Sequence, residues 1–317
     1  MKNIILVVTG PTATGKSELA EKIAEKINGE IINADIGSWY KPLSIGTAKP
    51  DLSQAKVPHH LFDILDKPKQ FTVVEFRDHV EKLAQEIWSR GHIPIVTGGS
   101  AFYVKSLWYK TQDSGSSSEI EKDIMGSSRT NFELWNELFT VDPVRAEKIN
   151  SNDRYRIVRA LGIYKSTGKK PSEFEPIYDP IAQLYGIFCV RDRKDLYDRI
   201  NKRTGIMLQA GWIQEVENLL GSEWEEFLID KKIIGYDDII HYLRGSKTQK
   251  DYNELVSIIQ QKTRNYAKRQ ITFLSKLKKD IDAHTSKNNH TAEIDLTLCD
   301  VGLYINGLSD QLFKTLD

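Results

Sequence analysis

The sequence predicts an α/β fold in which a parallel β-sheet is flanked by helices and carries a small helical insertion. Three short apolar runs predict the first strands, at residues 3–9, 30–34 and 93–97. Runs that are apolar throughout, rather than alternating, are typical of parallel strands buried on both faces. Helical patterns between these runs supply the crossover connections that a parallel sheet needs.

Apolar spacing and a capping signal predict the first two helices. Leu19, Ile23 and Ile27 recur at helical spacing after the first strand, which predicts a helix over 16–28. Before the third strand, Thr72 and Glu75 have the spacing of a capping box, and a helix is expected to begin there.

The middle of the chain departs from this pattern. Residues 111–128 are polar and rich in serine, and helical patterns follow at 131–139 and 154–167. We therefore expect a small helical insertion made of residues 113–180.

After the insertion the pattern of the core returns. An apolar run at 184–190 predicts another strand, and helices are expected at 196–220 and 252–277. The core is thus expected to consist of residues 1–112 and 181–317.

Composition places the chain among ordinary globular proteins. The 44 basic and 44 acidic residues balance and 40% of the residues are hydrophobic, so disorder driven by charge repulsion is not expected. Two cysteines, Cys189 and Cys299, are too few for a disulfide framework or a zinc knuckle, which fits a reducing cytosol. No apolar stretch is long enough for a signal peptide or a membrane span, so we expect a cytoplasmic protein without a membrane partner.

Acidic and basic residues are separated along the chain. Residues 214–230 contain six acids and no base, whereas residues 255–279 contain seven bases and no acid. The seven bases, here called the basic stripe, are Lys262, Arg264, Lys268, Arg269, Lys276, Lys278 and Lys279. Such a local concentration on a neutral chain predicts one anionic partner at one place. Tyr266 and Phe273, also in this segment, are expected to pack into the core, with stacking on a base as the alternative.

A phosphate-binding loop is the most specific motif. Residues 10–17 read GPTATGKS and match G-x-x-x-x-G-K-[ST] between a predicted strand and a predicted helix. Backbone N–H groups, the helix start and the ammonium of Lys16 attract phosphate oxygens, and the hydroxyl of Ser17 can ligate Mg²⁺. The motif predicts a polyphosphate ligand and a P-loop NTPase-like core, without specifying a nucleoside triphosphate.

Asp35 directly follows the second predicted strand, so we expect it near the phosphate loop at the carboxyl edge of the sheet. A carboxylate there can accept a proton from a nucleophile that attacks beside the phosphates. Capping of a turn is the alternative role. The third strand ends in Gly98-Gly99-Ser100 rather than in the acid that usually holds the metal of a phosphate-loop NTPase, which weakens the prediction of ATP hydrolysis.

Segments along nearly the whole chain resemble, in order, the tRNA dimethylallyltransferase (tRNA isopentenyltransferase, IPP transferase) family of bacterial type. They are GPTATGKS at 10–17, IINAD at 31–35, YKPLSIGTAKP at 40–50, VPHHLFDI at 57–64, VTGGSAFYVKSL at 96–107, NDRYRIVRAL at 152–161, DLYDRINKR at 195–203, IGY at 234–236 and TRNYAKRQITF at 263–273. The resemblance implies transfer of a dimethylallyl group from dimethylallyl diphosphate to the exocyclic amine of the adenosine 3′ of a tRNA anticodon. It implies the anticodon stem-loop of tRNA and dimethylallyl diphosphate as partners, Mg²⁺ as cofactor, and a monomer.

The resemblance also implies roles for matching residues. Asp35 matches the general base, Thr47 and Ser100 match residues where the adenine meets the prenyl donor, and Arg199 matches a cationic clamp. The implied diphosphate-binding residues are Gly10, Pro11, Thr12, Ala13, Thr14, Gly15, Lys16 and, through Mg²⁺, Ser17. The implied tRNA-binding residues are Asp35, Ile36, Gly37, Ser38, Tyr155, Arg156, Arg159, Lys232, Arg264, Lys268, Arg269 and Gln270. For the arginines of the insertion, where the family grips the anticodon arm, a solvated helix face is the alternative.

Several positions depart from the family pattern. Ile36 and Ser38 stand where the family has serine and glutamine, Gly162 where it has glutamate, Asp237 where it has a basic residue, and Glu121 where it has arginine. The sequence therefore leaves three alternatives open: an adenine-nucleotide isopentenyltransferase, a small-molecule kinase, and a tRNA-binding paralogue with weakened catalysis. The insertion and the basic stripe favour tRNA over a free nucleotide, which needs neither.

Overall fold

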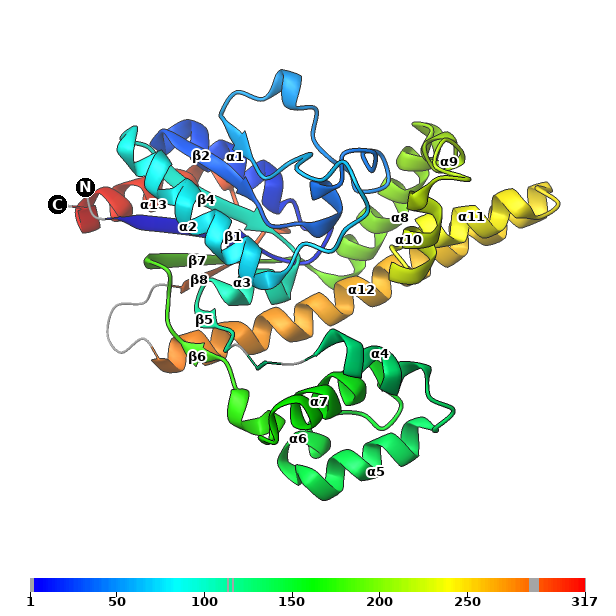
Figure 1. The fold of residues 1–317 in the computed structure, drawn as a ribbon. Coiled ribbons are helices and arrows are strands. Elements are labelled where there is room, and N and C mark those ends of the chain that lie inside the picture. Colours follow the sequence, from blue (N-terminus) through cyan, green and yellow to red (C-terminus); the bar gives the residue numbers. More distant parts are fainter. Residues whose placement is uncertain (1–2, 113, 116, 285–290, 317) are drawn as a thin grey trace. The chain divides into compact units, whose positions relative to one another are not determined.

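The computed structural model describes residues 3–112, 114–115, 117–284 and 291–316, with only the backbone of 309–316. The chain forms two compact units, Met1–Trp108 with Pro180–Asp317 and Tyr109–Asp179 (Figure 1). The second unit begins before the expected residue 113 because β5 (Tyr109–Lys110) pairs antiparallel with β6 (Ile177–Tyr178).

Within the described residues, the first unit contains a six-stranded parallel sheet. Its strands are β1 (Ile4–Thr9), β2 (Gly29–Asn33), β3 (His59–His60), β4 (Ile93–Gly98), β7 (Gln183–Val190) and β8 (Thr291–Asp295). Their order is β3-β2-β4-β1-β7-β8, and every pairing is parallel, which confirms the predicted fold class. The chain leaves the central β1 toward β2 on one side and later returns through β7 on the other. The carboxyl end of β1 is therefore a topological switch point, where open α/β sheets bind ligands.

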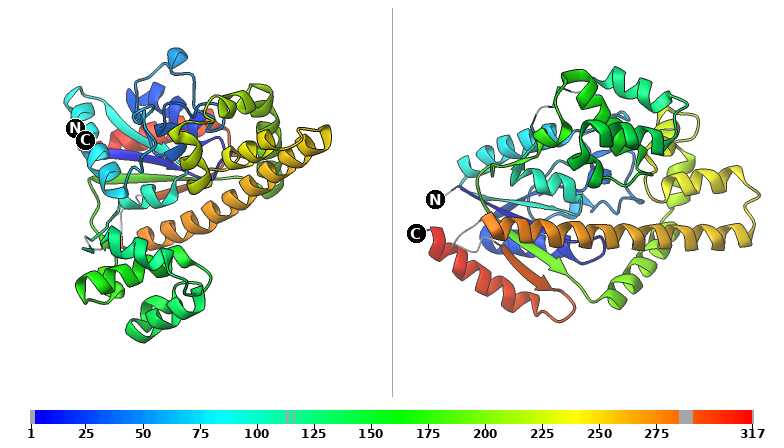
Figure 2. Two further views of the ribbon diagram at one scale, coloured as in Figure 1. Left: turned by 45° about the vertical axis from the view of Figure 1, so that its right-hand side comes forward. Right: turned by 90° about the horizontal axis from the view of Figure 1, so that it is seen from below.

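Helices cover both faces of this sheet (Figures 1 and 2). On one face lie α1 (Lys16–Ile27) and α13 (Val301–Leu316), and on the other lie α2 (Val73–Ser89), α3 (Ala101–Ser106) and α12 (Gln249–His284). Leu6 and Val8 of β1 pack against Leu19 and Ile23 of α1 in the core of the first face. The capping box of α2 is present as predicted, with Thr72 and Glu75 bonded reciprocally.

The C-terminal half differs from the sequence-based expectation. The helix expected over 196–220 is wrong as one element: α8 (Arg193–Gln209) ends before Gly211, which has a φ of 101°, and α9 (Trp212–Glu217) begins after it. A φ in this left-handed region interrupts a helix and favours glycine. Two further helices, α10 (Glu223–Lys231) and α11 (Tyr236–Arg244), lie in a part of the chain for which the sequence analysis predicted no helix.

The second unit is a helical bundle with its own core. Its helices are α4 (Ser118–Gly126), α5 (Asn131–Val141), α6 (Pro143–Glu147) and α7 (Arg154–Thr167). Leu134 and Leu138 of α5 are fully buried against Ile157 and Leu161 of α7. Short 3-10 helices complete the chain: η1 (Ile36–Trp39) and η2 (Leu52–Gln54) in the first unit and η3 (Pro171–Phe174) in the second.

Across the part of the chain that the structure describes, every helix is too short or too polar to traverse a lipid bilayer. Both Cys189 and Cys299 carry free thiols.

A buried carboxylate ties β2 to the elements beside it. The side chain of Glu30 is 2% exposed and accepts hydrogen bonds from Arg90 (2.8 Å), His60 (2.6 Å) and His92 (2.7 Å). Burial alone would raise the pKa of Glu30, but these three partners outweigh it and lower the pKa from 4.5 to about 2. Glu30 therefore stabilises the fold in its ionised form.

We predict that Glu30→Gln lowers the free energy of unfolding by about 3 kcal/mol at neutral pH, since the pKa difference converts to that order. Ionised Glu30 stabilises the folded state fully at pH values above the pKa of this side chain in the unfolded protein, near 4.5. This stabilisation is lost as the pH falls toward the pKa in the folded protein, about 2. Urea unfolding at several pH values should show that the difference in the free energy of unfolding between the variant and the wild type shrinks as the pH falls. Glu81→Gln, at an exposed position on α2, is the control. A difference in the free energy of unfolding that stays constant with pH would contradict the prediction.

Candidate active site at the carboxyl edge of the sheet

The phosphate loop joins the carboxyl end of β1 to α1. Gly15 and Ala13 both adopt left-handed conformations, with φ of 101° and 65°. Thr14 is fully buried and donates its hydroxyl to the carbonyl of Pro11 at 2.9 Å, so this side chain shapes the loop. A Cβ atom at Gly10 would lie 2.6 Å from the carbonyl oxygen of Cys189 on β7, which explains the glycine there.

Two arginines brace the outside of this loop. Arg191 donates from Nε to the carbonyl of Thr14 at 2.9 Å, and Arg199 donates from Nε to the carbonyl of Ala13 at 2.8 Å. Guanidinium groups thus neutralise the two carbonyl dipoles that would otherwise repel an anion. Arg199 lies at the loop, as expected for a clamp, and part of its donor set is committed to the loop backbone.

Lys16 and Asp35 meet between the loop and the end of β2. The ammonium Nζ of Lys16 lies 3.4 Å from Oδ2 of Asp35, and the lysine side chain is only 8% exposed. The backbone N–H of Gly99 donates to Oδ1 of Asp35 at 2.6 Å. One carboxylate oxygen is therefore fixed by the turn that follows β4, and the other faces Lys16, the cation that the motif supplies for phosphate.

Gln270 connects α12 to both of these elements. Its Oε1 accepts a hydrogen bond from the N–H of Thr12 at 2.9 Å, and its Nε2 donates to the carbonyl of Gly99 at 2.7 Å. The residue is 4% exposed. Both ends of its amide are thus bonded inside the chain, and its expected contact with tRNA stays a prediction. Its role here is to hold the phosphate loop against the end of β4.

Ser100 and the turn after Asp35 form the next wall. The N–H of Ile36 donates to Oγ of Ser100 at 3.1 Å, and Ser38 lies buried in the 3-10 helix η1. The Ile36 contact uses the backbone, so the local fold does not depend on the side chain that departs from the family pattern.

Thr47 packs on the same turn. A Cβ atom at Gly37 would lie 2.7 Å from Cγ2 of Thr47, so only glycine leaves room for that methyl group. The Thr47 hydroxyl donates to the carbonyl of Leu43 at 2.7 Å. Ser100, which is distant in sequence, is thus brought to the same edge of the sheet as Asp35, Gly37 and Thr47.

Two further residues interact electrostatically with Asp35: Arg203, which the sequence analysis did not assign, and Tyr266, for which it gave two alternatives. Burial lowers the pKa of Arg203, the charge of Asp35 opposes that shift, and the charge of Arg199 reinforces it. Among the described residues no hydrogen bond or ion pair engages Arg203. Its spacing of four from Arg199 on α8 places both on one helix face, a signal that the sequence contained.

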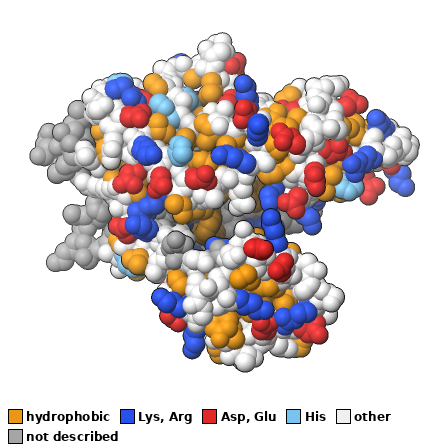
Figure 3. Space-filling view, viewed as in Figure 1, with side chains coloured by type: hydrophobic (Ala, Val, Ile, Leu, Met, Phe, Trp, Pro, Cys, Tyr) orange, Lys and Arg blue, Asp and Glu red, His pale blue; other side chains and the backbone are white. Residues whose placement is uncertain are grey.

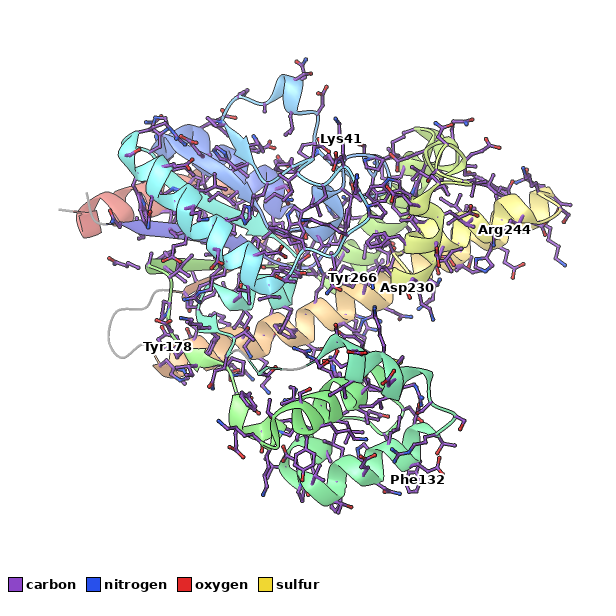
Figure 4. All side chains as sticks on the ribbon, in the orientation of Figure 1. Lys41, Phe132, Tyr178, Asp230, Arg244 and Tyr266 are labelled. Atoms are coloured by element: carbon purple, nitrogen blue, oxygen red, sulfur yellow. The ribbon has the colours of Figure 1, made fainter. Side chains whose placement is uncertain are left out.

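The second is Tyr266 on α12, beside the loops at the strand ends (Figure 4). Burial raises the pKa of Tyr266 to about 12, Asp35 adds to the shift, and the side chains of Ser100 and Gln270 interact with its hydroxyl. The expectation that Tyr266 packs simply into the core is therefore incomplete. The same expectation is wrong for Phe273, which is 36% exposed.

The basic stripe lies on α12, and its members differ in availability. Lys262 pairs with Asp237 at 3.2 Å and Asp238 at 2.6 Å, which explains the acid at position 237 and removes Lys262 from the free cations. Arg264 donates to Asn201 at 2.6 Å. By contrast, Lys268 and Arg269 are exposed.

Basic and acidic side chains are intermixed on the surface around α10 and α11 (Figure 3). Lys232 is exposed at the end of α10, with a φ of 49°. It is therefore available to a ligand, though not as part of a purely basic surface.

The expected tRNA-binding residues of the second unit lie on α7. Tyr155 is 66% exposed, Arg156 pairs with Asp153 at 3.4 Å, and Arg159 pairs with Glu121. Neighbouring Arg154 is a structural residue, because its guanidinium donates to the backbone carbonyls at the end of α4 and beyond. Hydrophobic side chains also reach the surface of this unit, including Phe132 on α5 (Figures 3 and 4).

Known proteins match this chain over most of its length. The family model described as IPP transferase matches residues 38–277. A tRNA dimethylallyltransferase of Alkaliphilus oremlandii is 38% identical over 285 residues, covering 86% of this chain and 88% of that protein.

Two solved structures are similar. The full-length tRNA isopentenylpyrophosphate transferase of Bacillus halodurans is 28% identical with a TM-score of 0.66, covering 100% of this chain and 97% of that one. A eukaryotic dimethylallyltransferase acting on tRNA is 27% identical with a TM-score of 0.75, covering 98% of this chain and 77% of that one. These matches extend over both units, and the chain belongs to the IPP transferase family.

Proposed function

We propose that this enzyme transfers a dimethylallyl group from dimethylallyl diphosphate to the exocyclic amine of the adenosine immediately 3′ of a tRNA anticodon. Its family and its relatives make it a tRNA dimethylallyltransferase. The observation that carries the detailed proposal is the pairing of Lys16 with Asp35, which puts an anion-binding cation and a proton acceptor at one point.

The phosphate loop supports binding of the diphosphate. Its backbone amides and Lys16 would hold the leaving group, and Arg199 and Arg203 would add positive charge from α8. The allylic carbon is already activated by its leaving group, so the enzyme needs chiefly to neutralise departing charge and to align the amine.

The donor set also fits Mg²⁺. Ser17 is exposed at the start of α1, and the described residues contain no group of three or more His, Cys, Asp or Glu side chains suited to a metal. Mg²⁺ commonly binds through one or two protein oxygens together with substrate phosphates and waters. A bound Mg²⁺ would neutralise charge on the diphosphate, with Ser17 as its protein ligand.

We assign the role of general base to Asp35, and its contact with Lys16 supports this assignment. The amine nitrogen bonds to the allylic carbon, the bond from that carbon to the bridging oxygen breaks, and diphosphate leaves with the electron pair. The amine loses a proton to Asp35. Oδ1 of Asp35 stays bonded to the N–H of Gly99, so Oδ2 is the acceptor.

We propose that tRNA is bound by exposed lysine and arginine side chains of α12 and by the second unit. We also propose that the target adenosine is flipped out of its stack to reach Asp35. We further propose that the enzyme acts as a monomer in the cytosol, which the two free thiols fit. A small-molecule kinase is disfavoured by relatives that are named tRNA dimethylallyltransferase.

Purified protein incubated with dimethylallyl diphosphate, Mg²⁺ and unmodified tRNA from its host is expected to yield prenylated adenosine, detected by mass spectrometry of the digested tRNA. Free adenosine monophosphate should be a poor acceptor. Prenylation of the nucleotide but not of tRNA would support the adenine-nucleotide alternative, and tRNA binding without product would support a paralogue with weakened catalysis.

Asp35→Asn is predicted to reduce single-turnover transfer by about 10²- to 10⁴-fold, the usual contribution of a general base. The asparagine oxygen can still accept the Gly99 hydrogen bond, so affinity for tRNA should change little. Asp66→Asn, an exposed carboxylate of the same unit, is the matched control. Near-wild-type transfer by the Asp35 variant would remove Asp35 as the base.

The double variant Lys268→Ala, Arg269→Ala is expected to weaken tRNA binding and to flatten its salt dependence, because each lost phosphate contact reduces the slope by about one. Filter binding across a salt series measures both quantities. Lys26→Ala with Lys82→Ala removes two exposed bases elsewhere in the first unit and should leave the slope unchanged. Equal slopes for the two double variants would exclude this surface of α12 from phosphate contact.

A further inference from the structure

Two Ile-Gly motifs of the sequence, at 45–46 and 234–235, meet around one tryptophan. Trp212, the first residue of α9, is 2% exposed. A Cβ atom at Gly46 would lie 2.0 Å from its Nε1, and a Cβ atom at Gly235 would lie 2.1 Å from its Cη2. The indole ring therefore fills a slot that only two glycines can form, and it fixes α9 against both segments.

A carboxylate on the next turn of α9 closes this junction. Glu215 accepts hydrogen bonds from the backbone N–H groups of Ser44 (2.9 Å), Ile45 (2.7 Å) and Gly46 (3.2 Å). The hydroxyl of fully buried Tyr236 donates to the same carboxylate at 2.7 Å. Three consecutive amides bound to one ionised group form a strong, charge-assisted clamp, here called the Glu215 clamp.

The clamped segment leads directly into the candidate active site. Thr47 follows Gly46, and its methyl group rests on Gly37, two residues after Asp35. The Thr47 hydroxyl, bonded to the carbonyl of Leu43, stiffens the same loop. A chain of contacts thus runs from α9 through residues 44–47 to the turn that carries Asp35.

We propose that Glu215 is a positioning residue of the transfer reaction, which acts through Thr47 to hold the turn after Asp35 in place beside the acceptor adenine. The inference rests on the proposed function and adds a role outside the phosphate loop. Because the clamp reaches the acceptor side and not Lys16, its loss should affect use of tRNA while leaving diphosphate binding intact.

Glu215→Gln tests this, because it keeps the side-chain shape and removes the charge that the three amides share. We expect kcat/KM for tRNA to fall about 10- to 100-fold, as for small displacements of reacting groups. The Kd for inorganic diphosphate with Mg²⁺, measured by calorimetry, should stay within about twofold of wild type. Glu217→Gln, exposed on the same helix, is the matched control.

A binding readout separates positioning from general damage. Anticodon stem-loops with adenosine or with an abasic site at the target position should differ in affinity for the wild type, and this difference should shrink in Glu215→Gln. Glu215→Asp, which restores the carboxylate, should recover part of it. Thr47→Ser removes only the methyl group on Gly37 and should lower kcat/KM for tRNA in the same direction, even if Glu215→Gln folds poorly.

Three results would overturn the inference. Equal kcat/KM for Glu215→Gln and Glu217→Gln would show that the clamp is dispensable, and a parallel loss of diphosphate binding would show a general structural role. Unchanged kinetics of Thr47→Ser would break the contact chain. If the wild-type protein itself prenylates no tRNA, the proposed function fails and the inference falls with it, an outcome distinct from an inactive variant beside an active wild type.

Discussion

The contact between Lys16 and Asp35 joins the phosphate loop to the turn after β2 and lies at the centre of the candidate active site. It requires that β1 and β2 end at the same edge of a parallel sheet, with β4 between them to supply the N–H of Gly99. The positive charge of buried Lys16 is balanced by the carboxylate of Asp35 when no ligand is bound. In the proposed function, an anionic diphosphate at Lys16 would compete for that cation and would release the carboxylate to interact with a proton donor. This ion pair would then couple binding of the diphosphate to the availability of Asp35 as a proton acceptor.

The loop that carries this pair is not self-sufficient. Residues more than 170 positions away hold it: Arg191 and Arg199 bond its carbonyls, and Gln270 bonds the N–H of Thr12. The C-terminal helices therefore help to shape the phosphate loop as much as the N-terminal strands do. Gln270 is particularly constrained, because a buried amide that lost either partner would leave an unsatisfied polar group costing about 1–3 kcal/mol.

Short sequence patterns predicted those parts of the molecule whose structure is determined by residues close together in sequence. The apolar strands, the capping box of Thr72 and the phosphate loop lie where the sequence placed them, as does Asp35 at the end of β2. What could not be predicted depends on long-range partners. No residue near Lys262 in sequence indicates that Asp237 pairs with it. The basic pattern of the same helix also gives no indication that Gln270 is buried against the phosphate loop. The same holds for the Glu215 clamp, whose partners are some 170 residues away.

The helix α12 shows how a single turn can serve two surfaces. Lys268, Arg269 and Gln270 are consecutive, yet the first two side chains are exposed and the third is buried against the phosphate loop. Successive residues on a helix are rotated by about 100°, so adjacent positions face different surroundings. Gln270 therefore fixes the turn that carries Lys268 and Arg269 relative to the phosphate loop and to the turn after β4, so the exposed and the buried surfaces of α12 share one rigid backbone segment.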